Sequence, residues 1–203
     1  MQYHGTSNFI TEYLGRISFP LFAFLLVEGY LHTKNLKKYY KRLIIFAIIS
    51  QIPFMLFRTL VGEWKMLNIM FTLLCGLLCI TAYDKIKKEY ISFPLCLIII
   101  FIGNLLNVDY GWFGITIILI LYIFRSSKIL KSIAYILVIM FYFYLSGVKY
   151  ISIDTIKLFI AYVSPIIFIL LYNGKEGKKI KYFFYWFYPI HMFIIYGLSF
   201  WFC

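Results

Sequence analysis

The sequence predicts an all-α, polytopic integral membrane helix bundle with about eight transmembrane helices, and three observations lead to this fold class. The 203 residues are 63% hydrophobic with a mean hydropathy of +0.87, which is more apolar than a soluble domain of this size needs. Eight apolar stretches divide the chain, each close to the ~17–25 residues that cross a ~30 Å hydrocarbon core. Lysine and arginine are unevenly distributed among the connecting loops.

The apolar stretches follow one another without a soluble domain between them. They run at residues 17–31, 43–61, 68–83, 91–106, 110–124, 129–147, 154–172 and 182–203. Five of them contain a proline, which membrane helices tolerate when neighbouring groups satisfy the freed backbone. The fourth and fifth are joined only by NVDYG, which predicts a tight helical hairpin. Residues 1–203 are therefore predicted to form a single transmembrane domain.

Basic residues concentrate in alternate loops. Fifteen of the 20 lie in one set: Lys34, Lys37, Lys38, Lys41, Arg42, Lys85, Lys87, Lys88, Arg125, Lys128, Lys131, Lys175, Lys178, Lys179 and Lys181. The positive-inside rule makes this set cytoplasmic in the plasma membrane. With eight helices both termini are then extracytoplasmic, an arrangement that we expect if one further helix preceded Met1.

Composition excludes several functions. The net charge of +12 sits in short loops, where it sets topology and attracts anionic lipid, so we do not expect nucleic acid as a partner. All four cysteines lie in apolar stretches without nearby histidine or carboxylate, so neither a metal site nor a disulfide framework is predicted. The sequence contains no P-loop, GxSxG or HExxH motif.

Charged or titratable side chains inside apolar stretches are costly and mark candidate sites. Glu28 lies six residues before Lys34, and His32 follows four residues later on the same helix face. The pair suits proton transfer or ligand contact, or it is an interfacial pair that reaches water. His191 lies about 15 Å from Lys181 at 1.5 Å per residue, near mid-membrane, and directly follows the Pro189 break, which favours a functional over a structural histidine.

Other polar residues are open to two interpretations each. Arg16 and Asp109 are either interface anchors or the lining of an outward vestibule. Asn68 and Thr72, four residues apart, favour hydrogen bonding between helices. Lys38, Lys41 and Arg42 form either a solvated positive-inside cluster or a site for a phosphorylated ligand, because arginine pairs with phosphate through two hydrogen bonds.

Together these residues resemble the TraX family, named for the conjugation protein that acetylates pilin. The matching segments are GRISFPLFAFLLVEGYLHTKNLKKYYKRL (15–43), SQIPF (50–54), N-x-x-F-T (68–72), DYGWFG (109–114) and FYPIHMF (187–193). They follow the family order over most of the chain. The family normally opens with another transmembrane helix that carries an Asp-His pair, so the resemblance implies a TraX-like domain that is incomplete at its N-terminus.

The resemblance implies a membrane acyltransferase that uses cytoplasmic acetyl-CoA as acyl donor and no metal. On this hypothesis the general base is His191 or the histidine of the family's further N-terminal helix, and Glu28 and His32 orient groups or relay protons. The phosphates of acetyl-CoA meet Lys38, Lys41 and Arg42. The acceptor, an amine or hydroxyl of a peptide or glycan, arrives at an outer mouth. Its expected lining is Arg16, Asn68, Thr72, Asp109, Tyr110 and Tyr188.

Two other functions remain open from the sequence. A small proton-coupled transporter would use Glu28 and His191 as a proton path, although the two halves show no repeat symmetry. A non-catalytic membrane scaffold or fragment would fold in lipid without binding or consuming acetyl-CoA.

Overall fold

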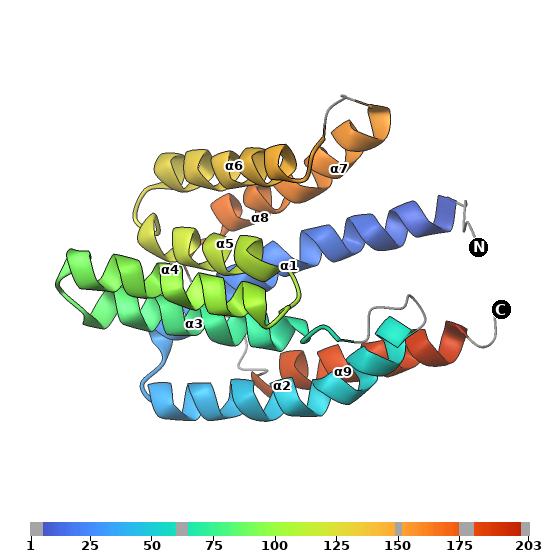
Figure 1. Ribbon diagram of the computed structural model, residues 1–203, viewed down its shortest axis with the longest axis horizontal. Helices are drawn as coiled ribbons and strands as arrows, with labels where there is room; N and C mark the ends of the chain where they lie inside the picture. The colour runs from blue at the N-terminus through green and yellow to red at the C-terminus, as the bar shows by residue number, and fades with distance from the viewer. Residues whose placement is uncertain (1–5, 60–64, 149–151, 175–180, 200–203) are drawn as a thin grey trace. The chain divides into compact units, whose positions relative to one another are not determined.

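The computed structural model describes residues 6–59, 65–148, 152–174 and 181–199, and these ranges are almost entirely helical (Figure 1). The helices are α1 (Thr6–His32), α2 (Leu36–Thr59), α3 (Ile69–Lys85), α4 (Glu89–Leu105), α5 (Gly111–Ile123), α6 (Lys128–Leu145), α7 (Ile153–Val163), α8 (Pro165–Leu171) and α9 (Lys181–Ser199). Between Leu67 and Val108 there is an isolated parallel β-bridge. The predicted all-α class is confirmed.

Within the described residues each predicted apolar stretch corresponds to helix, with two differences, and residues 60–61 and 200–203 of the predicted stretches lie outside the described ranges. Helix α1 begins at Thr6, whereas the apolar stretch begins at residue 17. Hydropathy marks where a chain prefers lipid, whereas a helix can continue through a polar segment that lacks proline. The seventh stretch is divided into α7 and α8 by Pro165, which has no N–H to donate and occupies the first position of α8.

Three helical segments in the described residues are long and apolar enough to cross a membrane. They are α2, α6 and the continuous run Ile153–Leu171. Helices α4 and α5 are apolar but shorter. Many large apolar side chains are exposed along these helices, among them Ile52, Phe101 and Leu137, as a lipid-facing surface requires. A membrane location is therefore supported, and the number of eight spans stays a prediction.

The chain divides into two compact units. The first comprises Met1–Leu31 and Thr116–Asn173, and the second His32–Ile115 and Gly174–Cys203. In the first unit α6, α7 and α8 pack against one another. Tyr135 is fully buried there, and its hydroxyl donates to the carbonyl of Tyr162 at 2.7 Å, which ties α6 to α7.

In the second unit α2 packs against both α3 and α9, and α3 packs against α4. Phe46 stacks on Tyr185 with ring centroids 5.0 Å apart and meets Trp186 edge-on at 5.3 Å, so aromatic packing fixes α9 beside α2. The buried Cys79 and Cys96 thiols each donate to the other residue's carbonyl, at 3.8 and 3.5 Å, which brings α3 close to α4.

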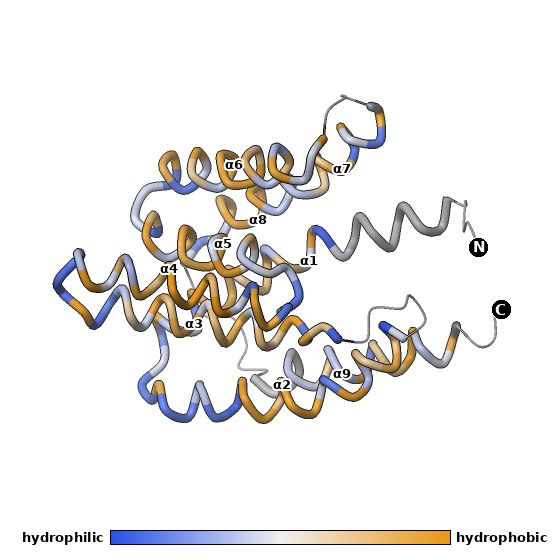
Figure 2. Tube along the Cα trace, viewed as in Figure 1, coloured by the Kyte–Doolittle hydropathy of each residue, from blue (hydrophilic) through white to orange (hydrophobic). Residues whose placement is uncertain are grey.

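The second unit carries its positive charge at one end. The Tyr40 hydroxyl bonds to Thr81 Oγ1 at 2.7 Å and donates to the Leu77 carbonyl at 3.1 Å, so the start of α2 lies beside the last turns of α3. Figure 2 shows hydrophilic residues at the start of α2 and at the turn between α3 and α4, with apolar residues along the helices between. This end contains Lys37, Lys38, Lys41, Arg42, Lys85, Lys87 and Lys88. Two of the predicted cytoplasmic loops thus share one end of the unit.

Candidate functional site

Asn68 is the centre of a buried polar cluster in the second unit. It caps α3, where its Oδ1 accepts from Met70 N at 2.9 Å, and its side chain is completely buried. Its Nδ2 donates to the Ala47 carbonyl at 2.7 Å and to Gln51 Oε1 at 2.9 Å, both on α2. The predicted helix–helix hydrogen bonding of Asn68 therefore joins α3 to α2.

Gln51 completes this connection, and sequence reasoning did not assign it to the site. Its Oε1 also accepts from Asn68 N at 3.0 Å, and its Nε2 donates to the Met66 carbonyl at 2.9 Å. One side chain thus holds the extended segment that leads into α3. The sequence feature that could have identified Gln51 is an amide side chain inside an apolar helix, in the segment SQIPF.

The turn between α4 and α5 is held against the start of α3. Leu67 N donates to the Asn107 carbonyl at 3.0 Å and Asp109 N donates to the Leu67 carbonyl at 2.8 Å, while the buried Thr72 hydroxyl donates to the Asp109 carbonyl. Thr72 and Asp109, predicted separately, are therefore in direct contact.

The same turn has an unusual backbone. Asn107, Tyr110 and Gly111 have φ values of 50°, 62° and 48°, all in the left-handed region. Glycine adopts this conformation readily, whereas a bulky residue such as Tyr110 does so rarely and under strain. Strain of this kind persists where surrounding contacts impose it, and it concentrates at functional sites.

Tyr188 on α9 is buried beside this turn. Its side chain is only 5% exposed, and its hydroxyl has no hydrogen-bond partner among the described residues. Asp109, Tyr110 and Arg58 all act on it electrostatically, and the backbone of Ile69 approaches it from the first turn of α3 without normal hydrogen-bond geometry. Tyr188, Asp109 and Tyr110, predicted as vestibule residues, are thus brought together.

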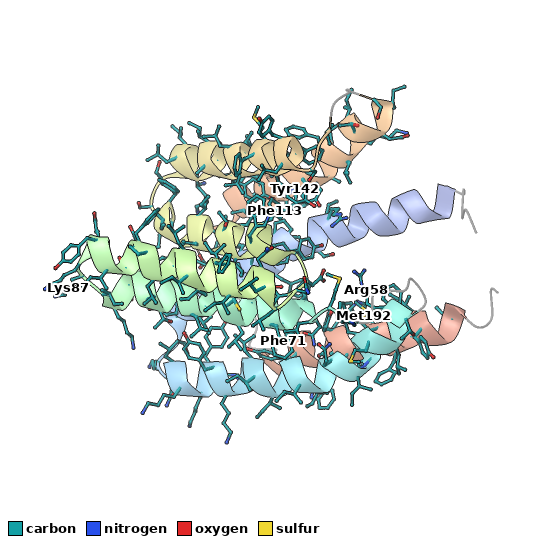
Figure 3. The ribbon with its side chains drawn as sticks, in the orientation of Figure 1. Arg58, Phe71, Lys87, Phe113, Tyr142 and Met192 are labelled. Atoms are coloured by element: carbon teal, nitrogen blue, oxygen red, sulfur yellow. The ribbon has the colours of Figure 1, made fainter. Side chains whose placement is uncertain are left out.

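Arg58 at the end of α2 belongs to the same region, and the sequence did not single it out. Its guanidinium donates to Met66 Sδ at 2.6 Å and lies 5.8 Å from the centroid of the Phe54 ring. In Figure 3 the labelled Arg58, Phe71 and Met192 mark this part of α2, α3 and α9. Hydropathy alone gave no signal for Arg58, because an arginine at a helix end is ordinary.

His191 lies one turn beyond Tyr188 on α9. Its ring stacks on Phe187 with centroids 5.1 Å apart and meets the Tyr188 ring edge-on at 5.3 Å. Nδ1 is 3.0 Å from the Phe187 carbonyl. Because a carbonyl oxygen only accepts, Nδ1 carries the proton, and Nε2 of the neutral ring keeps its lone pair. In that tautomer Nε2 is the ring nitrogen that can accept a proton.

The predicted phosphate-binding residues lie at the basic end of the second unit. Arg42 is about 14 Å from Gln51 along α2, at 1.5 Å per residue. Its guanidinium lies 5.7 Å from the Tyr39 ring centroid, and its buried Nε has no hydrogen-bond partner among the described residues. Lys38 and Lys41 are exposed next to it. A buried donor beside two exposed ammonium groups fits an anionic ligand.

The remaining predicted residues lie elsewhere. Arg16 is in the first unit, where its guanidinium lies 5.3 Å from the Tyr162 ring centroid. Glu28, also there, acts electrostatically on Lys131, a lysine only 8% exposed whose Nζ lies 5.9 Å from the Phe24 ring centroid. Phe24 and Glu28 are one turn apart on α1, so Lys131 is a partner that the sequence did not reveal. His32 ends α1 and is exposed.

No group of three or more His, Cys, Asp or Glu side chains in the described ranges is arranged to hold a metal ion. The polar groups that the structure brings together here are one imidazole, one phenol without a hydrogen-bond partner among the described residues, amides, and the charged side chains of Asp109 and Arg58. Such a set can remove a proton and donate hydrogen bonds to a substrate oxygen.

Comparison with known proteins gives two matches. The family model described as TraX protein matches residues 1–199. The chain is 29% identical over 198 residues to the "Probable fimbrial assembly protein FimC, serogroup H1" of Dichelobacter nodosus, covering 89% of this chain and 79% of that protein. No solved structure matches the chain significantly.

Proposed function

The chain belongs to the TraX protein family, and from this premise we propose that it is a polytopic membrane acyltransferase. It transfers an acetyl group from cytoplasmic acetyl-CoA to an amine or hydroxyl of a surface peptide or glycan. The name of the fimbrial assembly relative favours a pilin-like peptide as the acceptor. The chain acts in the plasma membrane with both termini extracytoplasmic, as its loop charges predict.

One observation carries this proposal. Four segments that the sequence shares with the family are far apart along the chain, and their polar side chains meet in one cluster of the second unit. They contribute Gln51, Asn68 with Thr72, Asp109 with Tyr110, and Tyr188 with His191. Packing alone does not require buried polar groups, because each costs free energy unless it is satisfied. A shared chemical task explains their convergence.

His191 is the general base in this proposal. Nε2 takes the proton of the acceptor amine or hydroxyl as that atom attacks the acetyl carbonyl carbon of the thioester. The tetrahedral intermediate then releases the CoA thiolate, which receives the proton from His191. A new amide or ester bond replaces the thioester bond, and free CoA leaves. The hydrogen bond from Nδ1 to the Phe187 carbonyl holds the ring in the required tautomer.

The basic end of the second unit is the proposed entry for acetyl-CoA. Lys38, Lys41 and Arg42 bind its phosphates, and the unpartnered Nε of Arg42 offers one oriented donor. In the first unit, Glu28 has Lys131 as a charged partner, so its proposed role is to orient groups on the cytoplasmic side. His32, exposed at the end of α1, remains the proposed proton relay between this region and water.

The test is transfer from radiolabelled acetyl-CoA in membranes that contain this chain, compared with His191→Ala and with membranes lacking the protein. We expect labelled product and released CoA only with the wild-type chain. Equal turnover by His191→Ala would remove that residue from the mechanism. Solute flux that does not depend on acetyl-CoA would indicate a transporter, and a folded protein without binding or turnover would indicate a scaffold.

A further inference from the structure

The buried hydroxyl of Tyr188 is costly as it stands. A buried donor without a partner destabilises a fold by about 1–3 kcal/mol. Tyr135 shows the ordinary solution, since its equally buried hydroxyl donates to the Tyr162 carbonyl at 2.7 Å. The Tyr188 side chain is 5% exposed, and its hydroxyl has no such acceptor within the described residues. Its proton is therefore available to a ligand rather than to the fold.

The surroundings of this hydroxyl restrict what it can bind. The first turn of α3, at Ile69, and the guanidinium of Arg58 both favour negative charge on a nearby oxygen. Asp109 acts on the same position and repels a resident anion. A neutral carbonyl oxygen becomes negative only during the reaction. It therefore suits a position that attracts developing negative charge and repels a resident anion better than a carboxylate or phosphate does.

The position relative to His191 suits such a group. Tyr188 and His191 are three residues apart, so they lie on one face of α9, and their rings meet at 5.3 Å. If His191 removes the proton of the nucleophile, the acyl carbonyl under attack lies close to His191. It therefore reacts next to the phenol of Tyr188.

We propose that Tyr188 is a catalytic residue whose hydroxyl donates a hydrogen bond to the carbonyl oxygen of the acetyl group. This inference rests on the proposed acyltransferase function. As the acceptor atom bonds to the carbonyl carbon, the carbonyl π electrons move onto the oxygen, and the phenol stabilises that charge while keeping its own proton. The electrons return when the carbon–sulfur bond breaks and the CoA thiolate leaves.

Tyr188→Phe tests the proposal in the full-length chain reconstituted in liposomes, with CoA release from acetyl-CoA as the readout. We expect kcat to fall roughly 100-fold, the range found when one oxyanion donor is removed, while KM for acetyl-CoA changes less than about twofold. Because the lost hydroxyl had no partner, thermal stability stays equal or rises.

Tyr135→Phe is the matched control, since it removes an equally buried hydroxyl that does have an acceptor. It should lower thermal stability and leave kcat unchanged. If the wild type is active and Tyr188→Phe has an unchanged kcat, the inference is overturned and the proposed function stands. The same holds if Tyr188→Phe changes nothing except a higher KM. A Tyr188→Phe chain that fails to fold shows a structural role and also overturns the inference. A wild type that releases no CoA overturns the proposed function and the inference with it.

Discussion

Gln51 on α2 accepts two hydrogen bonds from Asn68, one from the backbone nitrogen at 3.0 Å and one from Nδ2 at 2.9 Å. Its own Nε2 donates to the Met66 carbonyl at 2.9 Å. Leu67, between Met66 and Asn68, is in turn bonded to Asn107 and Asp109. Gln51 therefore positions the strained turn indirectly. It holds Met66 and Asn68, and the backbone of Leu67 between them is hydrogen-bonded to the turn.

Replacing Gln51 by leucine should destabilise the protein by about 1–3 kcal/mol, because it removes the hydrogen-bond partners of the buried Asn68 backbone N–H and of the Met66 carbonyl. Thermal unfolding in detergent measures this loss. Ile52→Leu is the control, since Ile52 is 64% exposed on the same helix and should change stability by less than about 0.5 kcal/mol. Equal stability of Gln51→Leu and wild type would contradict the role of this network.

His191→Asn separates the two functions of the imidazole. The asparagine amide can donate to the Phe187 carbonyl as Nδ1 does, but it provides no base at the position of Nε2. We expect normal expression and unfolding temperature with transfer reduced by about 10²–10⁴-fold. Acetyl transfer and thermal unfolding are measured on the same preparation. Turnover close to wild type would show that proton removal does not depend on His191.

The helices could be located well from the sequence because the apolar composition of membrane helices is recognisable in its hydropathy. Sequence reasoning missed the start of α1 at Thr6 and the division at Pro165, since neither changes how apolar a segment is. The start of α2 and the α3–α4 turn share one end of their unit, which is compatible with the predicted cytoplasmic position of both loops, and that position stays a prediction.

The site was predictable in part. Asn68, Thr72, Asp109 and Tyr188 stand out because polar groups are expensive inside apolar segments. Their mutual contacts depend on tertiary packing, which periodicity does not encode. Lys131 was missed because a basic residue near a cytoplasmic loop already has an explanation in topology, and Arg58 because an arginine at a helix end commonly reaches the membrane interface. Only the burial of Lys131 and the partners of the two residues, Glu28 for Lys131 and Met66 for Arg58, mark them as more than ordinary helix-end charges.

Lys131 and Glu28 should show energetic coupling. Lys131→Met leaves Glu28 beside α6 without its positive neighbour, and Glu28→Gln leaves the largely buried Lys131 without its negative neighbour. Each single change should therefore destabilise the chain, whereas the double variant should lose less than the sum of the two, with a coupling of about 0.5–3 kcal/mol. Chemical denaturation of the four proteins in detergent gives the cycle. Additive losses would show that the two side chains act independently.

Gly103→Ala should disturb the packing of the α4–α5 hairpin. A methyl group at Gly103 would overlap Ile115 Cδ1 and would also contact Cys75 Sγ and Val108 Cγ2, each at 3.7 Å. Overpacking of this kind costs about 1–3 kcal/mol. Because Ile115 is completely buried, its Cδ1 cannot swing out into solvent, so we expect this cost to outweigh the roughly 1 kcal/mol that alanine gains over glycine inside a helix and to lower the unfolding temperature.

The matched variant is Gly197→Ala, which also lies within a helix but has open space within 4 Å of the added methyl group. It should be neutral or slightly stabilising. Ile115→Val shortens the side chain that Gly103→Ala overlaps, so the combined variant should recover part of the lost stability. If Gly103→Ala were as stable as Gly197→Ala, or if Ile115→Val added its own loss without recovery, the close approach of α4 and α5 at this glycine would be wrong.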